Sequence, residues 1–324
     1  MQALNDLGTQ PEFDLLIATS MLDLTTARAC IDSLRAVPAV LYFHENQFEY
    51  PQRASADADI QLTTIKSAMS AEQLVFNSRW NRETFMRGAR ALLKKMPQRG
   101  LASVVDELDR KSTTLPVPLQ DDCFPFAAQR QAQKPIRLLW NHRWEFDKGP
   151  QRFENFLDRV EALQPFELIF CGQKFRETPQ AFSRILERYS DHVRHVGFAP
   201  DRETYLDLMR ESDVVVSCAE HEFQGLAVQE AIALGCVPLV PDRLAYREYV
   251  PRALRYQSNL QDPEKEAADM LETYVSLTNV GDAVHRELRT NISALSWSSM
   301  APQYEKLIQS VIGAPQGRDP DGTI

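Results

Sequence analysis

Two glutamates eight residues apart, Glu222 and Glu230, follow a short apolar run in the second half of the chain. The run Val214–Ser217 predicts a buried strand, Gly225 a turn, and the residues after it a helix. Ligands of α/β sheets bind at such carboxyl ends of parallel strands, and the first amides of the helix suit a phosphate. The two carboxylates suit hydroxyl groups at the two ends of a nucleotide sugar. A solvated pair of glutamates on a surface helix is the alternative.

A basic pair, Arg143 and Lys148, follows another predicted strand, Ile136–Trp140. A guanidinium and an ammonium that converge from one loop would stabilise a diphosphate, whose charge grows as it leaves. Glu145 and Asp147 lie in the same loop, so simple surface ion pairing is the alternative.

Polar side chains also end the predicted strand Ala39–Phe43, in the sequence His44-Glu45-Asn46-Gln47. Such groups are costly to bury and add little to packing, so a cleft is their natural location. A single histidine with a purely structural role is the alternative.

A strongly basic stretch runs from residue 79 to 99, with a net charge of +6 against −9 for the whole chain. The remainder carries −15, so an acidic protein would still present one basic face to a polyanion. The alternative is an ordinary solvated helix face. The cations predicted to contact a nucleic-acid backbone are Arg79, Arg82, Arg87, Arg90, Lys94, Lys95 and Arg99.

The elements needed to position these groups follow from alternation of short apolar runs with amphipathic stretches, which is typical of parallel sheets covered by helices. Repeated prolines between residues 113 and 135 disfavour helix and interior strand and indicate a linker. We expect an N-terminal Rossmann-like domain at 1–120, a linker at 121–135 and a C-terminal Rossmann-like domain at 136–297. A helix at 298–312 is expected to pack back on the first domain, and 313–324 to form a flexible tail.

Composition narrows the class further. With 324 residues, 44% hydrophobic and 25% charged, the chain has the composition of a globular protein of about two domains. No apolar run is long enough to span a bilayer, no secretory signal opens the chain, and the five scattered cysteines predict reduced thiols in the cytoplasm. No cysteine, histidine or carboxylate spacing predicts a metal site.

Three segments together resemble the GT-B glycosyltransferases, in particular the retaining family 4 group. Glu222-x7-Glu230 is similar to that group's paired glutamates, and Arg143-x4-Lys148 to its diphosphate-binding cations. Longer stretches are similar to the tRNA-queuosine α-mannosyltransferases, which move mannose from GDP-mannose to queuosine at the wobble position of tRNA. These stretches are Tyr42–Gln47 with Tyr50-Pro51, His142–Lys148, His221–Gly225, Phe76–Asn81 and Ser296-Trp297.

The resemblance implies a mannose donor bound by the second domain without a metal or other cofactor. It implies catalytic roles for His44 and Glu222, with Glu222 on the hexose, and Glu230 on the ribose. The remaining implied donor contacts are Arg143, Lys148, Gln224, Gly225 and Leu226. The implied acceptor contacts are Glu45, Asn46, Gln47 and Asn77.

Members of that family begin with a further strand, Gly-rich loop and helix, for which residues before Phe13 offer no counterpart. We therefore expect the first domain to lack its N-terminal strand–helix unit, through truncation or through an upstream start. Two other functions stay open: a family 4 transferase with a lipid or small-molecule acceptor, and a tRNA- or nucleotide-binding protein with reduced catalysis.

Overall fold

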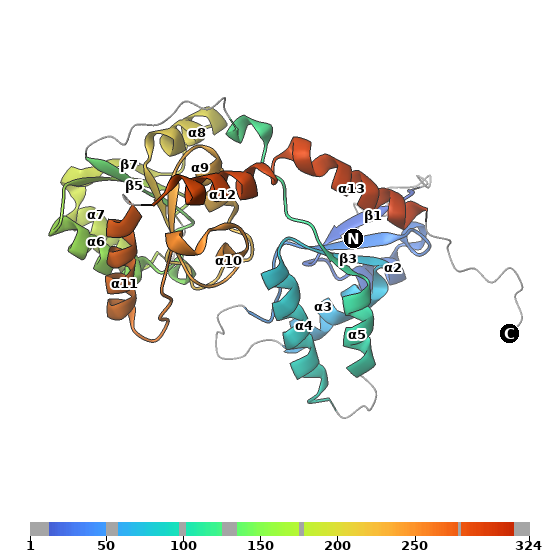
Figure 1. Cartoon of the computed structure of the whole chain (residues 1–324). Coiled ribbons are helices and arrows are strands. Elements are labelled where there is room, and N and C mark those ends of the chain that lie inside the picture. Colours follow the sequence, from blue (N-terminus) through green and yellow to red (C-terminus); the bar gives the residue numbers. More distant parts are fainter. Residues whose placement is uncertain are drawn as a thin grey trace, which may run out of the picture. The chain divides into compact units, whose positions relative to one another are not determined.

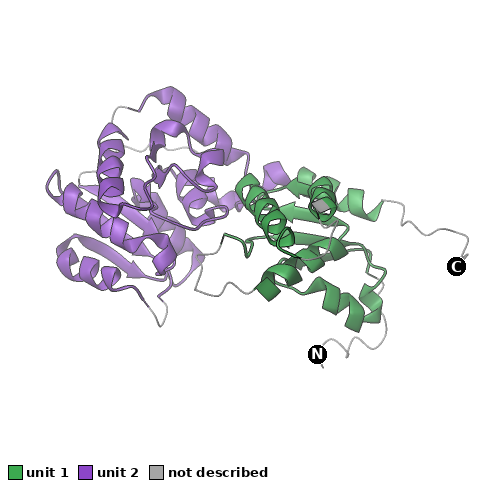
Figure 2. Ribbon diagram, turned by 90° about the horizontal axis from the view of Figure 1, so that it is seen from below, with its two compact units in different colours: residues 1–116, 301–324 green, residues 117–300 purple. Residues whose placement is uncertain are grey.

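The computed structural model describes residues 13–49, 58–96, 102–124, 135–174, 178–277 and 280–313. The chain forms two compact units, coloured separately in Figure 2. Unit 1 comprises residues 1–116 and 301–324, and unit 2 comprises residues 117–300. The division thus falls just after Pro116, four residues before the predicted end of the first domain, and again inside the last helix.

Unit 1 contains a parallel four-stranded sheet in the order β1-β2-β3-β4 (Figure 1). Its strands are β1 (Leu16–Thr19), β2 (Ala39–Phe43), β3 (Gln73–Phe76) and β4 (Ser112–Thr114). Its helices are α2 (Leu24–Cys30), α3 (Ala58–Ser70), α4 (Arg79–Leu93), α5 (Ala102–Arg110) and most of α13 (Trp297–Ile312).

Every residue of β2 is buried, because the sheet is covered on both faces at this strand. Leu41 and Phe43 belong to the core between the sheet and helices α3, α4 and α5. Tyr42 points the other way, and its hydroxyl donates to Leu115 O at 2.6 Å and lies 3.4 Å from the hydroxyl of Tyr304 in α13. β1 lies at the sheet's edge within the described residues, and Ile17 is 58% exposed there.

Unit 2 contains a parallel six-stranded sheet in the order β10-β9-β8-β5-β6-β7. Its strands are β5 (Ile136–Asn141), β6 (Phe166–Cys171), β7 (Val193–Gly197), β8 (Val214–Val216), β9 (Val237–Pro241) and β10 (Arg255–Tyr256). Its helices are α6 (Pro150–Glu161), α7 (Gln180–Arg188), α8 (Arg202–Glu211), α9 (Leu226–Ala233), α10 (Tyr246–Tyr249), α11 (Pro263–Ser276) and α12 (Asp282–Ser293).

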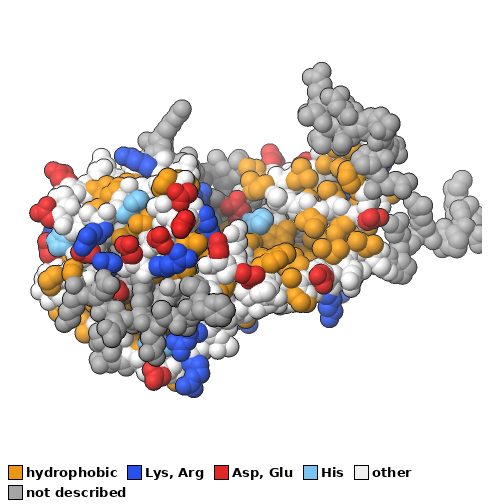
Figure 3. Space-filling view, turned by 90° about the horizontal axis from the view of Figure 1, so that it is seen from above, with side chains coloured by type: hydrophobic (Ala, Val, Ile, Leu, Met, Phe, Trp, Pro, Cys, Tyr) orange, Lys and Arg blue, Asp and Glu red, His pale blue; other side chains and the backbone are white. Residues whose placement is uncertain are grey.

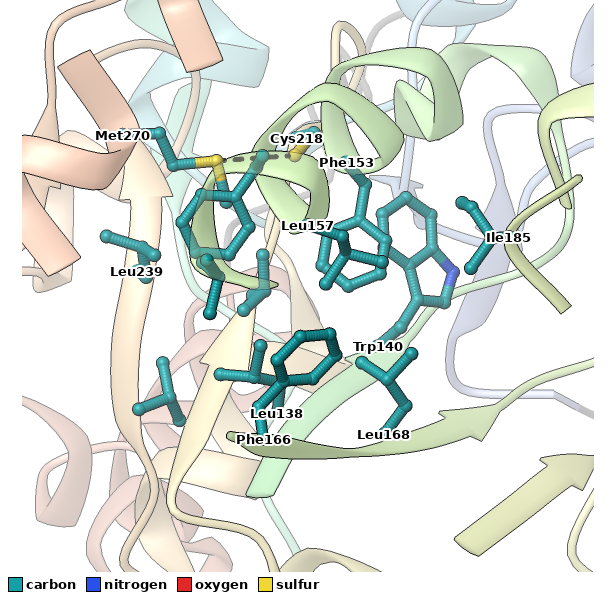
Figure 4. Packing of buried hydrophobic residues seen from close by; sticks show 14 of the residues in the cluster. Leu138, Trp140, Phe153, Leu157, Phe166, Leu168, Ile185, Cys218, Leu239 and Met270 are labelled. Carbon is teal, nitrogen blue, oxygen red and sulfur yellow. Dashed lines mark hydrogen bonds between the residues drawn. The ribbon is translucent and has the colours of Figure 1, made fainter. Parts of the chain in front are cut away.

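The main core of unit 2 lies between the sheet and helices α6, α7 and α11 (Figure 4). Leu138 and Trp140 of β5 point into it, against Phe153 of α6 and Ile185 of α7. The core continues to α11 through Met270, which lies beside the thiol of Cys218 in the loop after β8. This packing fixes the positions at which β5 and β8 end.

Single turns of 3-10 helix connect several elements: η1 (Asp32–Leu34), η2 (Asp121–Cys123), η3 (Phe146–Lys148), η4 (Ser190–His192) and η5 (Arg252–Leu254). The sequence did not predict β4, α5, α10, α11 or α12. The predicted linker lies mostly in residues 125–134, and the predicted absence of a first strand–helix unit concerns residues 1–12; both lie outside the described residues. None of the helices in the described ranges combines the length and apolarity that a bilayer crossing demands.

Candidate donor site

The strands β5 and β8 are neighbours in the sheet of unit 2, but their chains leave in opposite directions. β5 leads to β6 and β7 on one side, and β8 leads to β9 and β10 on the other. Such a switch point opens a crevice at the carboxyl ends of the two strands, where α/β sheets bind ligands. The loop 142–149 follows β5 and the loop 217–225 follows β8, so the two predicted donor motifs meet here.

Lys148 links the two loops. Its ammonium, which is almost fully buried, donates to His221 O at 2.9 Å and lies 3.4 Å from Glu222 Oε2 and 3.2 Å from Asp147 Oδ2. The Asp147 carbonyl also accepts a hydrogen bond from Glu220 N at 2.7 Å. One buried cation thus faces two carboxylates, and the cluster has a net charge of −1 before any ligand binds.

The electrostatics keep these groups ionised. Burial alone would raise the pKa of Asp147, but the hydrogen bond from His221 and the charge of Lys148 lower that pKa to about 2. Burial would likewise raise the pKa of Glu222, which the Lys148 charge holds below its usual range. The two carboxylates raise the pKa of Lys148 against the opposite effect of burial. The cluster therefore stays charged near neutral pH.

Gly149 allows the two loops to approach each other. Its φ is +67°, and a Cβ atom at this position would lie 2.3 Å from Cys218 O. Only glycine fits both the left-handed backbone and this contact. Gly149 also caps the start of α6, so the turn that carries Lys148 is fixed by its neighbour.

His142 lies beside the cluster as a neutral ring. Burial and the nearby Lys148 charge lower its pKa to about 4. Its Nε2 atom is buried and has no hydrogen-bond partner among the described residues. A buried polar atom without a partner is costly, so it indicates a place for a polar group of a ligand. The sequence placed His142 in a motif but gave it no role.

The His142 shift predicts acid sensitivity. Between pH 6.5 and 4 the unfolded chain binds a proton on this ring and the folded chain does not, so stability falls as the pH falls. The loss is about 3 kcal/mol over that interval. Urea unfolding at a series of pH values should show this slope, and His142→Phe should flatten it. His195→Phe, on strand β7, should keep the slope; equal slopes in wild type and His142→Phe would contradict the prediction.

Arg143 lies differently from Lys148. Its side chain is 52% exposed and pairs with Glu145 at 3.1 Å. Both predicted cations thus pair with a carboxylate of their own loop, as in the alternative, but only the Arg143–Glu145 pair lies at the surface, whereas the Lys148–Asp147 pair is buried. An exposed guanidinium in this loop is free to exchange Glu145 for a phosphate.

Glu230 is held by two donors from α8. Arg202 Nη1 and Tyr205 Oη each lie 2.7 Å from one of its carboxylate oxygens, and Asn141 donates to Tyr205 at 2.9 Å. Arg202 also pairs with Asp122 at 2.9 Å. Each carboxylate oxygen can accept a further hydrogen bond, so Glu230 is oriented and still able to bind hydroxyl groups.

The remaining predicted donor contacts lie at the start of α9. Gly225 has a φ of +81° and precedes the first helical residue, Leu226, which is 38% exposed. The first amides of a helix have no acceptor in a preceding turn, which leaves those of Gly225 and Leu226 for a ligand, whereas Val228 N already donates to Gly225 O at 3.0 Å. Gln224 is buried and lies otherwise than predicted, because both its N–H groups are taken by Val117 O and Gln229 Oε1 and its oxygen accepts from Val117 N. Gln224 therefore connects the segment at Val117 to α9.

A buried ion network lies behind the β8–α9 loop, and sequence reasoning missed it. Arg243 donates to Ala219 O at 2.8 Å, to Cys218 O at 3.1 Å and to Glu266 Oε1 at 2.8 Å. Arg152 pairs with Glu220 and lies 3.5 Å from Glu266. The network therefore fixes the backbone carbonyls from which the His221–Gly225 segment begins.

In unit 1, the side chains that follow β2 separate into exposed and buried groups. His44 is exposed, its ring lies 4.6 Å from that of Tyr42, and partial burial lowers its pKa below the usual value. Glu45 and Gln47 are half-buried. These three side chains lie at the carboxyl edge of the sheet, as predicted.

Asn46 and Asn77 are buried and bind the protein itself. Asn46 donates to Asn81 Oδ1 at 2.8 Å, and Asn77 donates to His44 O at 2.8 Å. Asn81 in turn donates to Phe43 O at 3.0 Å and to Asn77 Oδ1 at 2.8 Å. Amides consumed in this way hold the loop that carries His44, so positioning replaces the predicted acceptor contact for Asn46 and Asn77.

The basic helix α4 is partly neutralised by its neighbours. Arg82 pairs with Asp109 and Arg90 with Asp106, both at 2.8 Å, and Arg87 pairs with Glu49. Three of the predicted phosphate contacts thus already have carboxylate partners. Lys94 and Lys95 are exposed, and Arg99 lies outside the described residues. Arg82, Arg87, Arg90 and Lys94 line one hollow of about 550 Å³.

Solved structures and family models define the class. The chain is similar to a sucrose-phosphate synthase from Thermosynechococcus elongatus, with a TM-score of 0.74 and 16% identity over 97% of this chain and 77% of that one. It is also similar to Anabaena Alr3699/HepE in complex with UDP-glucose, with a TM-score of 0.70 and 14% identity over 95% and 81%. Residues 125–273 match the model "Glycosyl transferases group 1". The protein is a glycosyltransferase with the predicted α/β fold of GT-B type.

The particular family follows from the first unit and from curated relatives. Residues 1–119 match "tRNA-queuosine alpha-mannosyltransferase N-terminal". The chain is 31% identical over 258 residues to the tRNA-queuosine alpha-mannosyltransferase of Drosophila melanogaster, covering 76% of this chain and 68% of that protein. It is 21% identical, over 59% of this chain and 52% of the relative, to a Xanthomonas campestris GDP-mannose:cellobiosyl-diphosphopolyprenol alpha-mannosyltransferase. The chain belongs to the tRNA-queuosine alpha-mannosyltransferase family, which confirms the resemblance.

Proposed function

We propose that this protein transfers mannose from GDP-mannose to queuosine at the wobble position of tRNA, in the cytoplasm and with retention of the anomeric configuration. Family membership supports the acceptor, and the two relatives named for mannose transfer support the sugar. The observation that carries the donor site is the buried Lys148 between Asp147 and Glu222 at the switch point of unit 2.

The proposed donor chemistry follows from these groups. Glu230 binds the ribose, and the Glu222 carboxylate and the orphan His142 Nε2 bind the hexose. Arg143, Lys148 and the first amides of α9, at Gly225 and Leu226, stabilise the diphosphate as negative charge develops on it. These cations would do the work of a metal, so we propose a metal-independent reaction.

We propose that the acceptor residues lie in unit 1. His44 and Glu45 are ionisable side chains of the right kind to meet a hydroxyl acceptor, they follow β2 at the carboxyl edge of the sheet, and Gln47 comes soon after them in the chain. The Asn46–Asn77–Asn81 network fixes their backbone. Front-face attack by the queuosine hydroxyl, helped by the departing phosphate, would retain the configuration.

The direct test is transfer of labelled mannose from GDP-mannose to queuosine-containing tRNA, with and without EDTA. We expect transfer in both conditions and none to tRNA that lacks queuosine. Activity lost with EDTA would contradict the metal-independent step. Transfer to a polyprenol diphosphate glycan but not to tRNA would overturn the acceptor, and the Xanthomonas relative makes that substrate the right comparison.

The contacts of α4 predict which cations bind the tRNA backbone. Lys94 and Lys95 have no ion pair among the described residues, whereas Arg82 is paired with Asp109. Replacing both lysines by Gln should weaken tRNA binding and reduce the slope of log K against log salt by roughly 0.7 to 0.9 per lysine. Arg82→Gln should change the slope less, because the Arg82 guanidinium is already paired with Asp109. Filter binding across salt concentrations measures both, and an unchanged slope in the lysine double variant would place the tRNA track elsewhere.

Figure 3 adds a constraint on the acceptor side. On the face shown, hydrophobic side chains gather over unit 1, while charged side chains are frequent over unit 2. Exposed apolar residues of unit 1 include Ile17, Met21 and Leu22, on β1 and the turn after it. A polyanion gains little from such a surface, so we assign tRNA contact to α4 and not to β1.

A further inference from the structure

Tyr249 is a buried tyrosine with no assigned role, next to the proposed donor site. It ends α10, its side chain is almost fully buried, and its hydroxyl has no hydrogen-bond partner among the described residues. Its backbone is held, because Asn291 of α12 donates to Tyr249 O at 3.1 Å. The neighbouring Tyr246 differs, since its hydroxyl lies 2.7 Å from Ser217 Oγ.

The free hydroxyl points at the β8–α9 loop. A Cβ atom built on Gly225 would lie 2.7 Å from Tyr249 Oη and 3.6 Å from Glu222 Cγ. The hydroxyl and the Glu222 side chain therefore flank the same small space above Gly225. Burial raises the pKa of Tyr249 well above its usual value, and the nearby Glu222 charge contributes to the same shift.

Glu222 also interacts with Lys148. In the present arrangement its carboxylate lies 3.4 Å from the Lys148 ammonium, which also faces Asp147. A diphosphate that approaches Lys148 meets a cluster of net charge −1. For Lys148 to bind the phosphate, Glu222 must give up part of this contact. A largely enclosed carboxylate that loses its cation needs a donor in addition to Phe223 N, which donates to Glu222 Oε1 at 3.2 Å.

We propose that the Tyr249 hydroxyl is this second donor: it is a positioning residue that hydrogen-bonds Glu222 when a nucleoside diphosphate engages Lys148. The inference rests on the proposed donor site. Lys148 is then available to the diphosphate, and Glu222 is kept ionised and oriented toward the hexose. In the donor-free protein this arrangement leaves the buried Tyr249 hydroxyl without a hydrogen-bond partner among the described residues, which lowers the stability of the fold.

Tyr249→Phe tests the proposal. The variant loses only the hydroxyl, so the donor-free protein should keep its melting temperature or gain in it, since an unsatisfied buried group is removed. Affinity for GDP and for GDP-mannose, measured by calorimetry, should fall roughly 10- to 100-fold, as expected for a hydrogen bond to a charged group. The rise in melting temperature that GDP causes should shrink in step.

Tyr274→Phe is the matched control. Tyr274 is also buried in unit 2, but Gln164 already donates to its hydroxyl. This variant should lower the melting temperature and leave GDP affinity unchanged. Wild-type affinity in Tyr249→Phe would overturn the inference and leave the proposed function standing. A wild-type protein that binds neither GDP nor GDP-mannose would overturn the donor assignment itself, and this is seen before any substitution is made.

Discussion

Replacing Glu266 by Gln is expected to lower the free energy of unfolding by about 3–5 kcal/mol. Glu266 is 1% exposed and is the carboxylate that Arg243 contacts at 2.8 Å and Arg152 at 3.5 Å. Gln keeps the shape but removes the charge, so Arg243 is left buried without an ion-pair partner in the described part of the chain. The loss is a buried, uncompensated charge, which is among the most costly single changes.

Urea unfolding monitored by fluorescence measures this loss, and the same helix supplies the control. Glu264, two residues earlier in α11, pairs with Arg159 at 2.9 Å, but its side chain is 66% exposed. Glu264→Gln should cost no more than about 1 kcal/mol, because exposed ion pairs contribute little. Similar losses for the two variants would show that the network behind the donor loop does not stabilise the fold.

The Glu266 variant should also lose donor affinity. Arg243 holds Cys218 O and Ala219 O, from which the loop bearing Glu222 starts. If the guanidinium turns away from this position, the loop is no longer fixed, and we expect the KM for the donor to rise more than kcat falls. Glu264→Gln should leave both constants unchanged.

Most strands could be predicted because each contains a short run of apolar residues, and such a run indicates a buried strand. β2 occurs with the predicted bounds, Ala39–Phe43, and every one of its residues is buried. β4 was missed because Ser112–Thr114 is a short polar edge strand, without the run of apolar residues on which the prediction depended. Such a strand forms because β3 offers a free edge, and this is a tertiary effect.

The helix α11 was missed although its start carries readable signals. Asp262 accepts a hydrogen bond from Lys265 N, and Pro263 occupies the first helical position. An Asp followed by Pro before an amphipathic stretch is a frequent helix start. Attention to capping would have located this helix, and with it the Glu266 network.

The location of the donor site could be predicted, because the two motifs each follow a strand of the same sheet. Lys148 and Glu222 are 74 residues apart and meet because each follows a strand at the same edge of one sheet. What the sequence did not indicate is burial: it treated Arg143 and Lys148 as equivalent, yet one is exposed and the other is enclosed. In unit 1 it placed both His44 and Asn46 in a cleft, although an amide binds backbone as readily as substrate.

The different burial of Arg143 and Lys148 leads to the second prediction of a large effect. Lys148→Met should remove transferase activity and lower the free energy of unfolding by about 3–5 kcal/mol, because Asp147 and Glu222 lose their buried cation. Arg143→Met should also remove activity but cost no more than about 1 kcal/mol, because its ion pair with Glu145 is exposed. Chemical denaturation and single-turnover transfer measure the two effects separately.

A double variant separates charge balance from catalysis. Adding Glu222→Gln to Lys148→Met removes one of the two unpaired carboxylates, so part of the lost stability should return while activity stays absent. The coupling in this cycle should be favourable and on the order of 0.5–3 kcal/mol, as for residues in one network. Strict additivity would mean that Lys148 and Glu222 do not interact in the folded protein. Wild-type activity in Arg143→Met would leave Lys148 and the first turn of α9 to stabilise the leaving diphosphate without it.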